Sequence, residues 1–181
     1  DLGADMWELM YLIPVGRGEL LPSMTPQEVQ DSFQLIWQVE QRRKFVVKVT
    51  EAPHYRRFML EQGYDGRVHR VNAGKGFCFV SHHGDVYPSG FLPLSAGNVK
   101  TDDLVDVYRN SELFRRLRDP DLLDGPCGTC AWRDTCGGSR SRSYGLTGNP
   151  HASEPWCIHA VADGDETMPV ETGASSTAAS K

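Results

Sequence analysis

The sequence has little positive charge and no long apolar run. Its 181 residues include 19 lysines and arginines against 24 aspartates and glutamates, which gives a formal net charge of −5. This balance argues against a dedicated nucleic-acid binder, because such proteins gain much of their affinity from a basic face that neutralises phosphates. No apolar run approaches the roughly 20 residues that span a bilayer, and the start shows no basic segment followed by a leader-like stretch. We therefore expect neither a nucleic-acid partner nor a membrane partner.

Cysteine is scarce and unevenly placed. The five cysteines are an odd number, and none precedes Cys78. A chain of this length has room for one ordinary core or two small ones, so a disulfide scaffold is the weaker interpretation and thiolate ligation of a metal or cluster the stronger one. Thiolate ligands imply a reducing compartment, and we expect a cytoplasmic protein.

The first part of the chain predicts a strand, a helix and a second strand. Trp7 to Val15 is an apolar run that begins abruptly without an initiator methionine, which suggests a piece of a longer protein. Thr25 to Glu28 combine a capping box with proline at the first helical position, and the helix should end near Arg43. Phe45 to Pro53 is rich in β-branched residues and should form the second strand. A helix between two strands predicts parallel pairing and an α/β fold class.

The second part predicts smaller elements. A polar stretch from Tyr64 to Val71 marks a boundary between two modules, and Gly76 to Pro93 predicts a hairpin that turns at 82–85. Two short helices should follow at 101–109 and 111–118, the second capped by Ser111 and with Leu113, Phe114 and Leu117 on one apolar face. The end of the chain, 161–181, is poor in large apolar residues and is predicted to be disordered.

Four cysteines near the end have the spacing of a ligand set. Cys127, Cys130 and Cys136 form the pattern C-x2-C-x5-C, and Cys157 follows after twenty residues. Four thiolates suit either a tetrahedral zinc ion or a cubane iron–sulfur cluster, so their number leaves both open. Three ligands on one short loop favour a bulky cluster over zinc. Cys78 lies in a predicted strand among apolar residues, so we expect a buried, inert thiol there.

The neighbours of these cysteines also favour a cluster. Glycines let backbone amides approach sulfur, and arginines can offset the negative charge of a thiolate-ligated cluster. The residues concerned are Gly128, Gly137, Gly138, Arg133, Arg140 and Arg142.

The segment from Gly76 to Cys157 resembles a known module. It contains a hairpin, the tripeptide GNV, paired helices and the motif CGGSRSR in that order. In this it resembles the auxiliary-cluster module, called SPASM or twitch, of radical S-adenosylmethionine (SAM) enzymes, and it is most similar to the branch that includes haem-related and other tetrapyrrole-modifying enzymes. Leu12 to Gly18 and Val49 to Arg57 resemble late strand ends of the partial (β/α) barrel in the same enzymes.

The resemblance implies a domain organisation and a ligand set. Residues 1–63 would be the C-terminal βαβ part of a partial barrel, and 76–160 a small α+β auxiliary-cluster module. The resemblance assigns one 4Fe–4S cluster to Cys127, Cys130, Cys136 and Cys157. Relatives with two auxiliary clusters carry cysteine where this chain has Ser89 and Ser139, so we expect both serines to hydrogen-bond nearby backbone instead.

The resemblance also implies a function for a longer parent protein. Such a parent cleaves SAM reductively with a second 4Fe–4S cluster held by CxxxCxxC, a motif that this chain lacks, so the chain itself is not predicted to be a complete enzyme. Its substrate would be a tetrapyrrole or a peptide, and its electron donor a flavodoxin or a ferredoxin. The predicted SAM or substrate contacts are Arg17, Glu51, His54 and Arg56, which lie where a barrel strand opens into a loop. A zinc-binding interaction module and a simple electron-transfer domain remain the alternatives.

Overall fold

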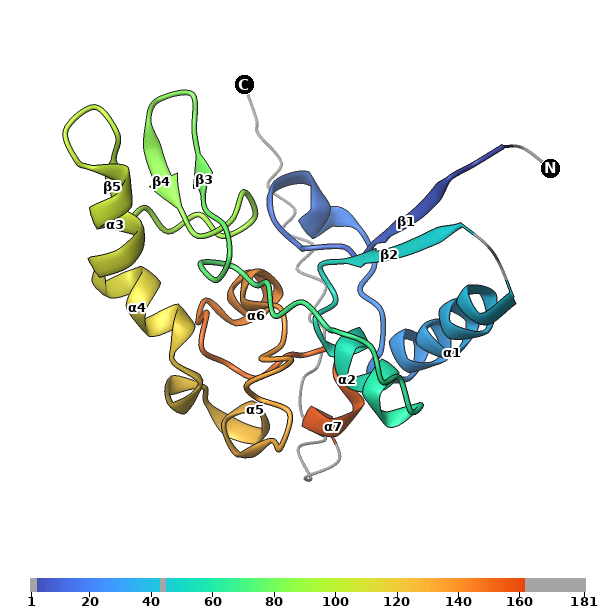
Figure 1. Ribbon diagram of the computed structural model, residues 1–181. Coiled ribbons are helices and arrows are strands. Elements are labelled where there is room, and N and C mark those ends of the chain that lie inside the picture. The colour runs from blue at the N-terminus through green and yellow to red at the C-terminus, as the bar shows by residue number, and fades with distance from the viewer. Residues whose placement is uncertain (1–2, 43–44, 162–181) are drawn as a thin grey trace, which may run out of the picture.

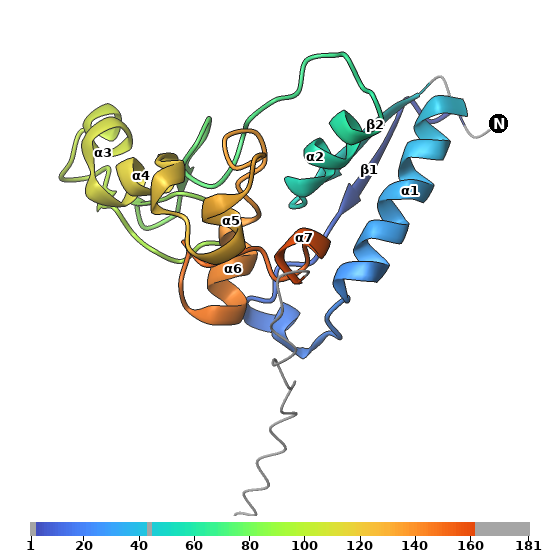
Figure 2. The ribbon, with the colours of Figure 1, turned by 90° about the horizontal axis from the view of Figure 1, so that it is seen from below.

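The computed structural model describes residues 3–42 and 45–161 of the chain. A strand–helix–strand unit lies at one end and a small antiparallel sheet with two helices at the other (Figure 1). The cysteine segment lies between these two parts, as the view from below also shows (Figure 2). The mixture of small sheets and helices confirms the predicted mixed α/β content. The predicted tail at 161–181 lies outside the described residues apart from Val161.

The first unit forms as its sequence predicts, with shorter strands. It consists of β1 (Met6–Met10), a 3-10 helix η1 (Gly16–Leu20), α1 (Pro26–Arg42) and β2 (Val46–Thr50). The two strands are parallel, with Met6 opposite Val46 and Met10 opposite Thr50. The capping box is present, because the Thr25 N–H donates to Glu28 Oε2 at 2.7 Å and the Glu28 N–H donates to Thr25 Oγ1 at 3.2 Å. The helix therefore begins at the predicted residue.

Both strands end earlier than predicted, because β2 stops where the backbone turns at Glu51. Glu51 has φ of 60°, a left-handed conformation that is costly for a residue with a side chain. After Met10 the first strand has one further link to its neighbour, a hydrogen bond from the Tyr11 N–H to the Thr50 carbonyl at 3.0 Å. Without a longer partner strand, residues 11–15 continue as a loop although Tyr11 and Ile13 are buried.

A helix that the sequence analysis missed follows directly. The stretch after Glu51 was expected to be a strand end opening into a loop, but α2 (His54–Glu61) begins there. Its buried residues join α1 in one core, where the Phe33 ring lies 5.1 Å from that of Tyr55 and 5.9 Å from that of Phe58. The apolar residues of α2 pack against α1, and this packing explains why the loop prediction was wrong.

The second part is a three-stranded sheet with two short helices. Its elements are β3 (Phe79–Val80), β4 (Asp85–Tyr87), β5 (Gly97–Asn98), α3 (Leu104–Asn110) and α4 (Glu112–Arg118). The predicted hairpin and paired helices are confirmed, and β5 adds a strand that had not been predicted. Phe114 and Leu117 of α4 are buried as expected. Ser111 occupies the N-cap of α4, but its hydroxyl makes no capping hydrogen bond.

The last segment returns to the first unit. It contains a 3-10 helix η2 (Pro120–Leu122), α5 (Gly125–Thr129), α6 (Arg140–Thr147) and α7 (Ile158–Val161). Trp156, just before α7, is 3% exposed and belongs to the core formed by α1 and α2. In the described part of the chain, no helix has the length and apolar character needed to cross a bilayer.

Candidate metal centre

The four predicted ligands lie on the returning segment. Cys127 is inside α5, Cys130 follows that helix directly, Cys136 lies in the turn before α6, and Cys157 precedes α7. All four are free thiols, and Cys157 is buried whereas the other three are half-buried. Among the residues that the structure describes, no group of three or more His, Cys, Asp or Glu side chains is arranged so that it could hold a metal ion.

Backbone amides donate to the sulfurs of the four cysteines, and those of His159 and Ala160 act on Cys157. The Glu154 N–H lies 3.3 Å from Cys127 Sγ. Two similar bonds of 3.4 Å link Trp132 N to Cys130 Sγ and Gly138 N to Cys136 Sγ. Hydrogen bonds to sulfur stabilise its negative charge and tune the reduction potential of a cluster that the sulfur ligates.

Gly138 is required by this geometry. Its φ is 62°, and a Cβ at this position would lie 2.6 Å from Arg140 Nη2 and 2.7 Å from Glu154 Cβ. A side chain would therefore force apart the groups that surround the sulfurs. The sequence prediction that glycine lets a backbone amide approach sulfur is confirmed for Gly138.

Burial and mutual proximity disfavour ionisation of the thiols. Burial raises the pKa of Cys136 to about 12, and the neighbouring Cys157 and Cys127 contribute to this rise against the hydrogen bond from Gly138. Burial also raises the pKa of Cys157, where Cys127 again acts in the same direction and the charge of Arg57 acts against it. Cys127, Cys136 and Cys157 thus interact electrostatically, and a bound cation or cluster would relieve the preference of Cys136 and Cys157 for the protonated form.

Arginines from two distant segments surround these thiols. Arg140 is 2% exposed, and its Nη1 donates to the carbonyls of Pro150 and Ala152 at 2.8 Å. The charge of Arg140 interacts with Cys127 and Cys136. The charge of Arg56 also interacts with Cys136. Within the described residues, one buried nitrogen of each of these arginines, Arg140 Nη2 and Arg56 Nη1, lacks a hydrogen-bond partner. Buried arginine nitrogens beside the half-buried thiols Cys127 and Cys136 suit a site for a negatively charged group.

The three arginines predicted to neutralise a cluster have different partners. Arg140 lies beside two of the thiols as expected, whereas Arg133 pairs with Asp121 at 2.8 Å near the surface. Arg142 is fully buried and pairs with Glu154. Arg57, beside Cys157, was missed by the sequence analysis, because only the helical geometry of α2 brings consecutive arginines toward the cysteine segment.

The Arg142–Glu154 pair joins the cysteine segment to the first unit. Arg142 Nη1 lies 3.1 Å from Glu154 Oε1, and Nη2 donates to the carbonyls of Leu12 and Glu51 at 3.1 and 2.7 Å. Its guanidinium carbon lies 4.0 Å from the centre of the Trp156 ring. Burial raises the pKa of Glu154, but the charge of Arg142, an electrostatic interaction with His54 and two backbone N–H groups hold that pKa below its ordinary value. The pair therefore remains charged in the interior.

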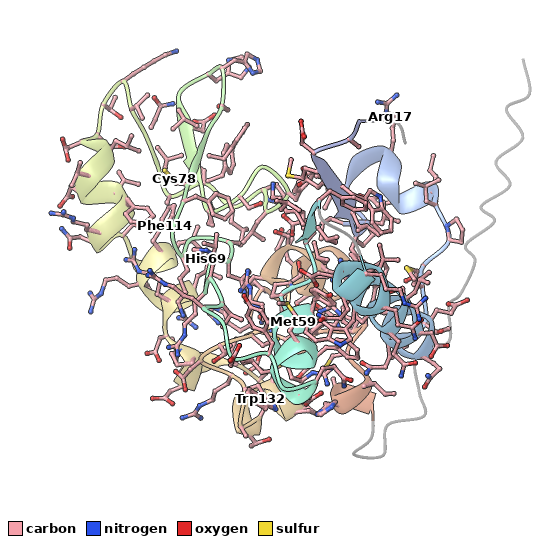
Figure 3. All side chains as sticks on the ribbon, turned by 45° about the vertical axis from the view of Figure 1, so that its right-hand side comes forward. Arg17, Met59, His69, Cys78, Phe114 and Trp132 are labelled. Atoms are coloured by element: carbon pink, nitrogen blue, oxygen red, sulfur yellow. The ribbon has the colours of Figure 1, made fainter. Side chains whose placement is uncertain are left out.

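The predicted SAM or substrate contacts occupy different environments. Glu51 is half-buried, accepts a hydrogen bond from the Ser139 hydroxyl at 3.4 Å, and lies in the electrostatic range of Arg56. His54 is 1% exposed, and neither of its ring nitrogens has a partner within the described residues. Arg17 is exposed on η1 and points away from the cysteine segment (Figure 3). The structure thus brings Arg56 within electrostatic range of Cys136, places Glu51 beside Ser139 of the cysteine segment, and leaves Arg17 apart.

The two serines hydrogen-bond backbone as predicted. Ser139 Oγ accepts from the Arg142 N–H at 3.2 Å and caps α6, and Ser89 Oγ accepts from the Phe91 N–H at 3.2 Å. Cys78 was expected to be a buried thiol within a strand, but it is half-buried and lies just before β3, where it packs against the cluster of Val86, Val107 and Phe114. In Figure 3 it lies near Phe114 and far from Trp132 of the cysteine segment.

No group of three or more His, Cys, Asp or Glu side chains in the described part of the chain is arranged to hold a metal ion, and it is the chemistry of the donor set and its surroundings that fits an iron–sulfur cluster. The donor set is four thiols, backbone amides donate to the sulfurs, and arginine nitrogens are buried nearby. Each feature stabilises negative charge on thiolate ligands.

Comparisons with known proteins agree with this site. Residues 72–131 match the SPASM family, described as an iron–sulfur cluster-binding domain. The chain is 36% identical over 172 residues to an AdoMet-dependent heme synthase of Methanosarcina barkeri, a match that covers 88% of this chain and 49% of that protein. It is also 38% identical over 96 residues to the mycofactocin maturase MftC of Mycobacterium ulcerans, covering 50% and 26%. A pre-heme d1 synthase of Dinoroseobacter shibae is 33% identical over 95 residues, covering 50% and 24%.

The site and the family match together define a class. The chain contains an iron–sulfur cluster-binding domain of the SPASM type. Its relatives then identify it as a radical SAM/SPASM protein near the haem branch, which confirms the resemblance drawn from the sequence. The chain spans about half the length of the heme synthases that it matches.

Proposed function

We propose that the chain is the cluster-binding C-terminal portion of a radical SAM enzyme, and that Cys127, Cys130, Cys136 and Cys157 hold one auxiliary 4Fe–4S cluster. The observation that carries this proposal is the convergence of mutually interacting thiols with amide donors and arginines. A bound cluster supplies one-electron redox chemistry. The chain's own residues hold the sulfurs, screen their charge and limit the access of water.

The proposal divides the chain into two working parts. Residues 1–63 are the last βαβ part of a partial barrel, and 76–160 are the auxiliary-cluster module. The intact parent would be cytoplasmic, bind a second cluster outside this chain, and cleave SAM reductively with electrons from a flavodoxin or a ferredoxin. The names of the relatives support a tetrapyrrole or a peptide as the substrate class.

Glu51 and Arg56 form the proposed link between the cluster and a substrate or SAM. Both lie between the end of β2 and the cysteine segment, and each bears a charge that interacts with the other. An arginine beside a carboxylate can orient polar groups of a ligand through charge-assisted hydrogen bonds. Arg17 and His54 stay predictions as further contacts.

Metal analysis of the anaerobically reconstituted chain tests this function. We expect about four irons and four sulfides per chain, with broad brown thiolate-to-iron absorbance. The expected product of SAM cleavage, 5′-deoxyadenosine, should be absent with the chain alone and should appear when the preceding segment of the parent is joined to it. Tight, stoichiometric zinc without competence for iron would contradict the proposal and favour a zinc-binding module.

A further inference from the structure

Arg57 is a buried arginine that connects three helices. On α2, its Nη1 pairs with Glu61 one turn further along the same helix. Its Nη2 donates to Gln30 Oε1 of α1 at 3.1 Å, and Nη1 also lies 2.9 Å from His159 Nε2 of α7. A guanidinium group only donates hydrogen bonds, so the ring nitrogen of His159 accepts this one. One side chain therefore holds α1, α2 and α7 together.

The contact with α7 reaches the predicted ligand Cys157. This cysteine directly precedes Ile158, the first residue of α7, and the backbone N–H groups of His159 and Ala160 act on its sulfur. The ring that Arg57 holds thus belongs to a residue whose own amide interacts with that sulfur. In both ribbon views α7 lies beside α2 (Figure 1, Figure 2). Arg57 can therefore fix the position of the Cys157 sulfur through His159.

One donor of the Arg57 guanidinium has no partner. Its Nε is buried and makes no hydrogen bond with another described residue. Buried polar groups are nearly always hydrogen-bonded, so a free donor here suits an anionic group bound beside it. The charge of Arg57 also stabilises the thiolate of Cys157, because it lowers the pKa that burial raises.

Glu61 offsets the charge of Arg57 only in part. The Glu61 side chain is 29% exposed and that of Arg57 is 2% exposed, so water screens the carboxylate more than the guanidinium. Arginine keeps its charge in the interior, because its guanidinium does not lose its proton in proteins. A fixed positive charge near a thiolate ligand favours the reduced state of a cluster, which is the more negative one.

We propose that Arg57 is a positioning residue that fixes Cys157 through His159 and raises the reduction potential of the auxiliary cluster. The inference rests on the proposed function, because it takes Cys157 as a ligand of that cluster. On reduction one electron enters the cluster from a chemical reductant, and the charge of the cluster becomes more negative by one while Arg57 keeps its proton. Because α2 lies within residues 1–63, one part of the chain sets the potential of a cluster held by the other.

Reduction potentials of iron-loaded variants test this role. The test variant is Arg57→Gln, and the control Arg115→Gln makes the same change of charge at an exposed position of α4. Each chain is reconstituted anaerobically and titrated with dithionite as the one-electron donor, while the electron paramagnetic resonance signal of the reduced cluster is followed. We expect Arg57→Gln to shift the equilibrium toward the oxidised form roughly tenfold, which is about 59 mV for a one-electron couple, and the control to change it little.

The variant Glu61→Gln separates charge from packing. It keeps the shape of the side chain but removes the carboxylate beside Arg57, so the potential should rise, opposite to the change in Arg57→Gln. A lowered potential in both variants would assign the shifts to loosened packing and overturn the inference. If Arg57→Gln takes up no iron, Glu61→Gln decides: a raised potential supports the inference, and an unchanged or lowered one contradicts it.

Iron content measured on the same samples separates the two proposals. If the wild-type chain takes up no iron, both the proposed function and the role of Arg57 are wrong. If every variant binds about four irons but Arg57→Gln and Arg115→Gln have the same potential, the role of Arg57 is wrong and the cluster assignment stands.

Discussion

Replacing Arg142 by methionine should destabilise the chain by several kcal/mol. The change removes the charge that faces Glu154 in the interior, where both side chains are at most 1% exposed. Breaking a buried ion pair from one side costs about 3–5 kcal/mol, because the remaining charge is left without compensation. The carbonyls of Leu12 and Glu51 also lose their donor, so we expect the free energy of unfolding to fall by at least about 3 kcal/mol.

Urea unfolding followed by tryptophan fluorescence measures this effect. Trp156 is a suitable reporter because its ring lies against the Arg142 guanidinium. The matched control is Arg116→Met, which breaks the exposed pair with Glu112, where the two side chains are 52% and 84% exposed. A surface pair of this kind contributes less than about 1 kcal/mol, so the control should unfold almost like the wild type.

The reasoning also predicts how the loss can be recovered. A marginally stable domain has about 5–15 kcal/mol in total, so Arg142→Met can leave part of the chain unfolded before urea is added. Adding Glu154→Gln removes the unpaired carboxylate and should recover part of the stability. Equal unfolding free energies for Arg142→Met and Arg116→Met would refute the role given to the buried pair.

Three further predictions follow from the same contacts. Burial lowers the pKa of His54 to about 4, against 6.5 in the unfolded chain, so the contribution of the neutral imidazole to the unfolding free energy is complete above pH 6.5 and falls by about 3 kcal/mol as the pH falls to 4. The variant His54→Phe should show a shallower decline of unfolding free energy over that pH range. An unchanged decline would contradict the role given to His54. Ser139→Ala should lower stability by about 1 kcal/mol through the lost cap of α6 yet keep its iron, and Ser89→Ala should also keep its iron. Iron loss in either variant would contradict the assignment of that serine as a residue outside the ligand set. Gly138→Ala should reduce cluster occupancy on reconstitution, because a Cβ would meet Arg140 and Glu154, and full occupancy would show that the turn adapts.

Local signals in the sequence predicted the elements that depend on local contacts. The capping box at Thr25 and Glu28 set the start of α1, and the apolar stripe of α4 predicted which side chains are buried. The strands were predicted too long, because their length depends on the turn at Glu51 and not on the apolar run itself. The helix α2 was missed because its stability comes from packing against Phe33 of α1, a contact that no local pattern encodes.

In the candidate site, too, local motifs were informative and contacts between distant segments were not predictable. The spacing of the cysteines predicts the ligands and the serine at 139 predicts a spectator, and both assignments stay predictions; the structure confirms the backbone hydrogen bond expected of Ser139. The burial of Arg142 was not predictable, because its partners come from Leu12, Glu51 and Glu154, which are distant in sequence. Long-range charge pairs are decided by the fold, and a sequence pattern shows only that an arginine is present.

The most direct test of the central claim is the iron content of single cysteine variants after anaerobic reconstitution. Cys130→Ala and Cys157→Ala should each lose most of the roughly four irons bound by the wild type, because each removes one of the four thiolates assigned to the cluster. Cys78→Ala is the matched control and should keep its iron, since Cys78 packs against the apolar cluster around Phe114. Iron that persists without Cys157 but disappears without Cys78 would contradict the ligand assignment on which the account depends.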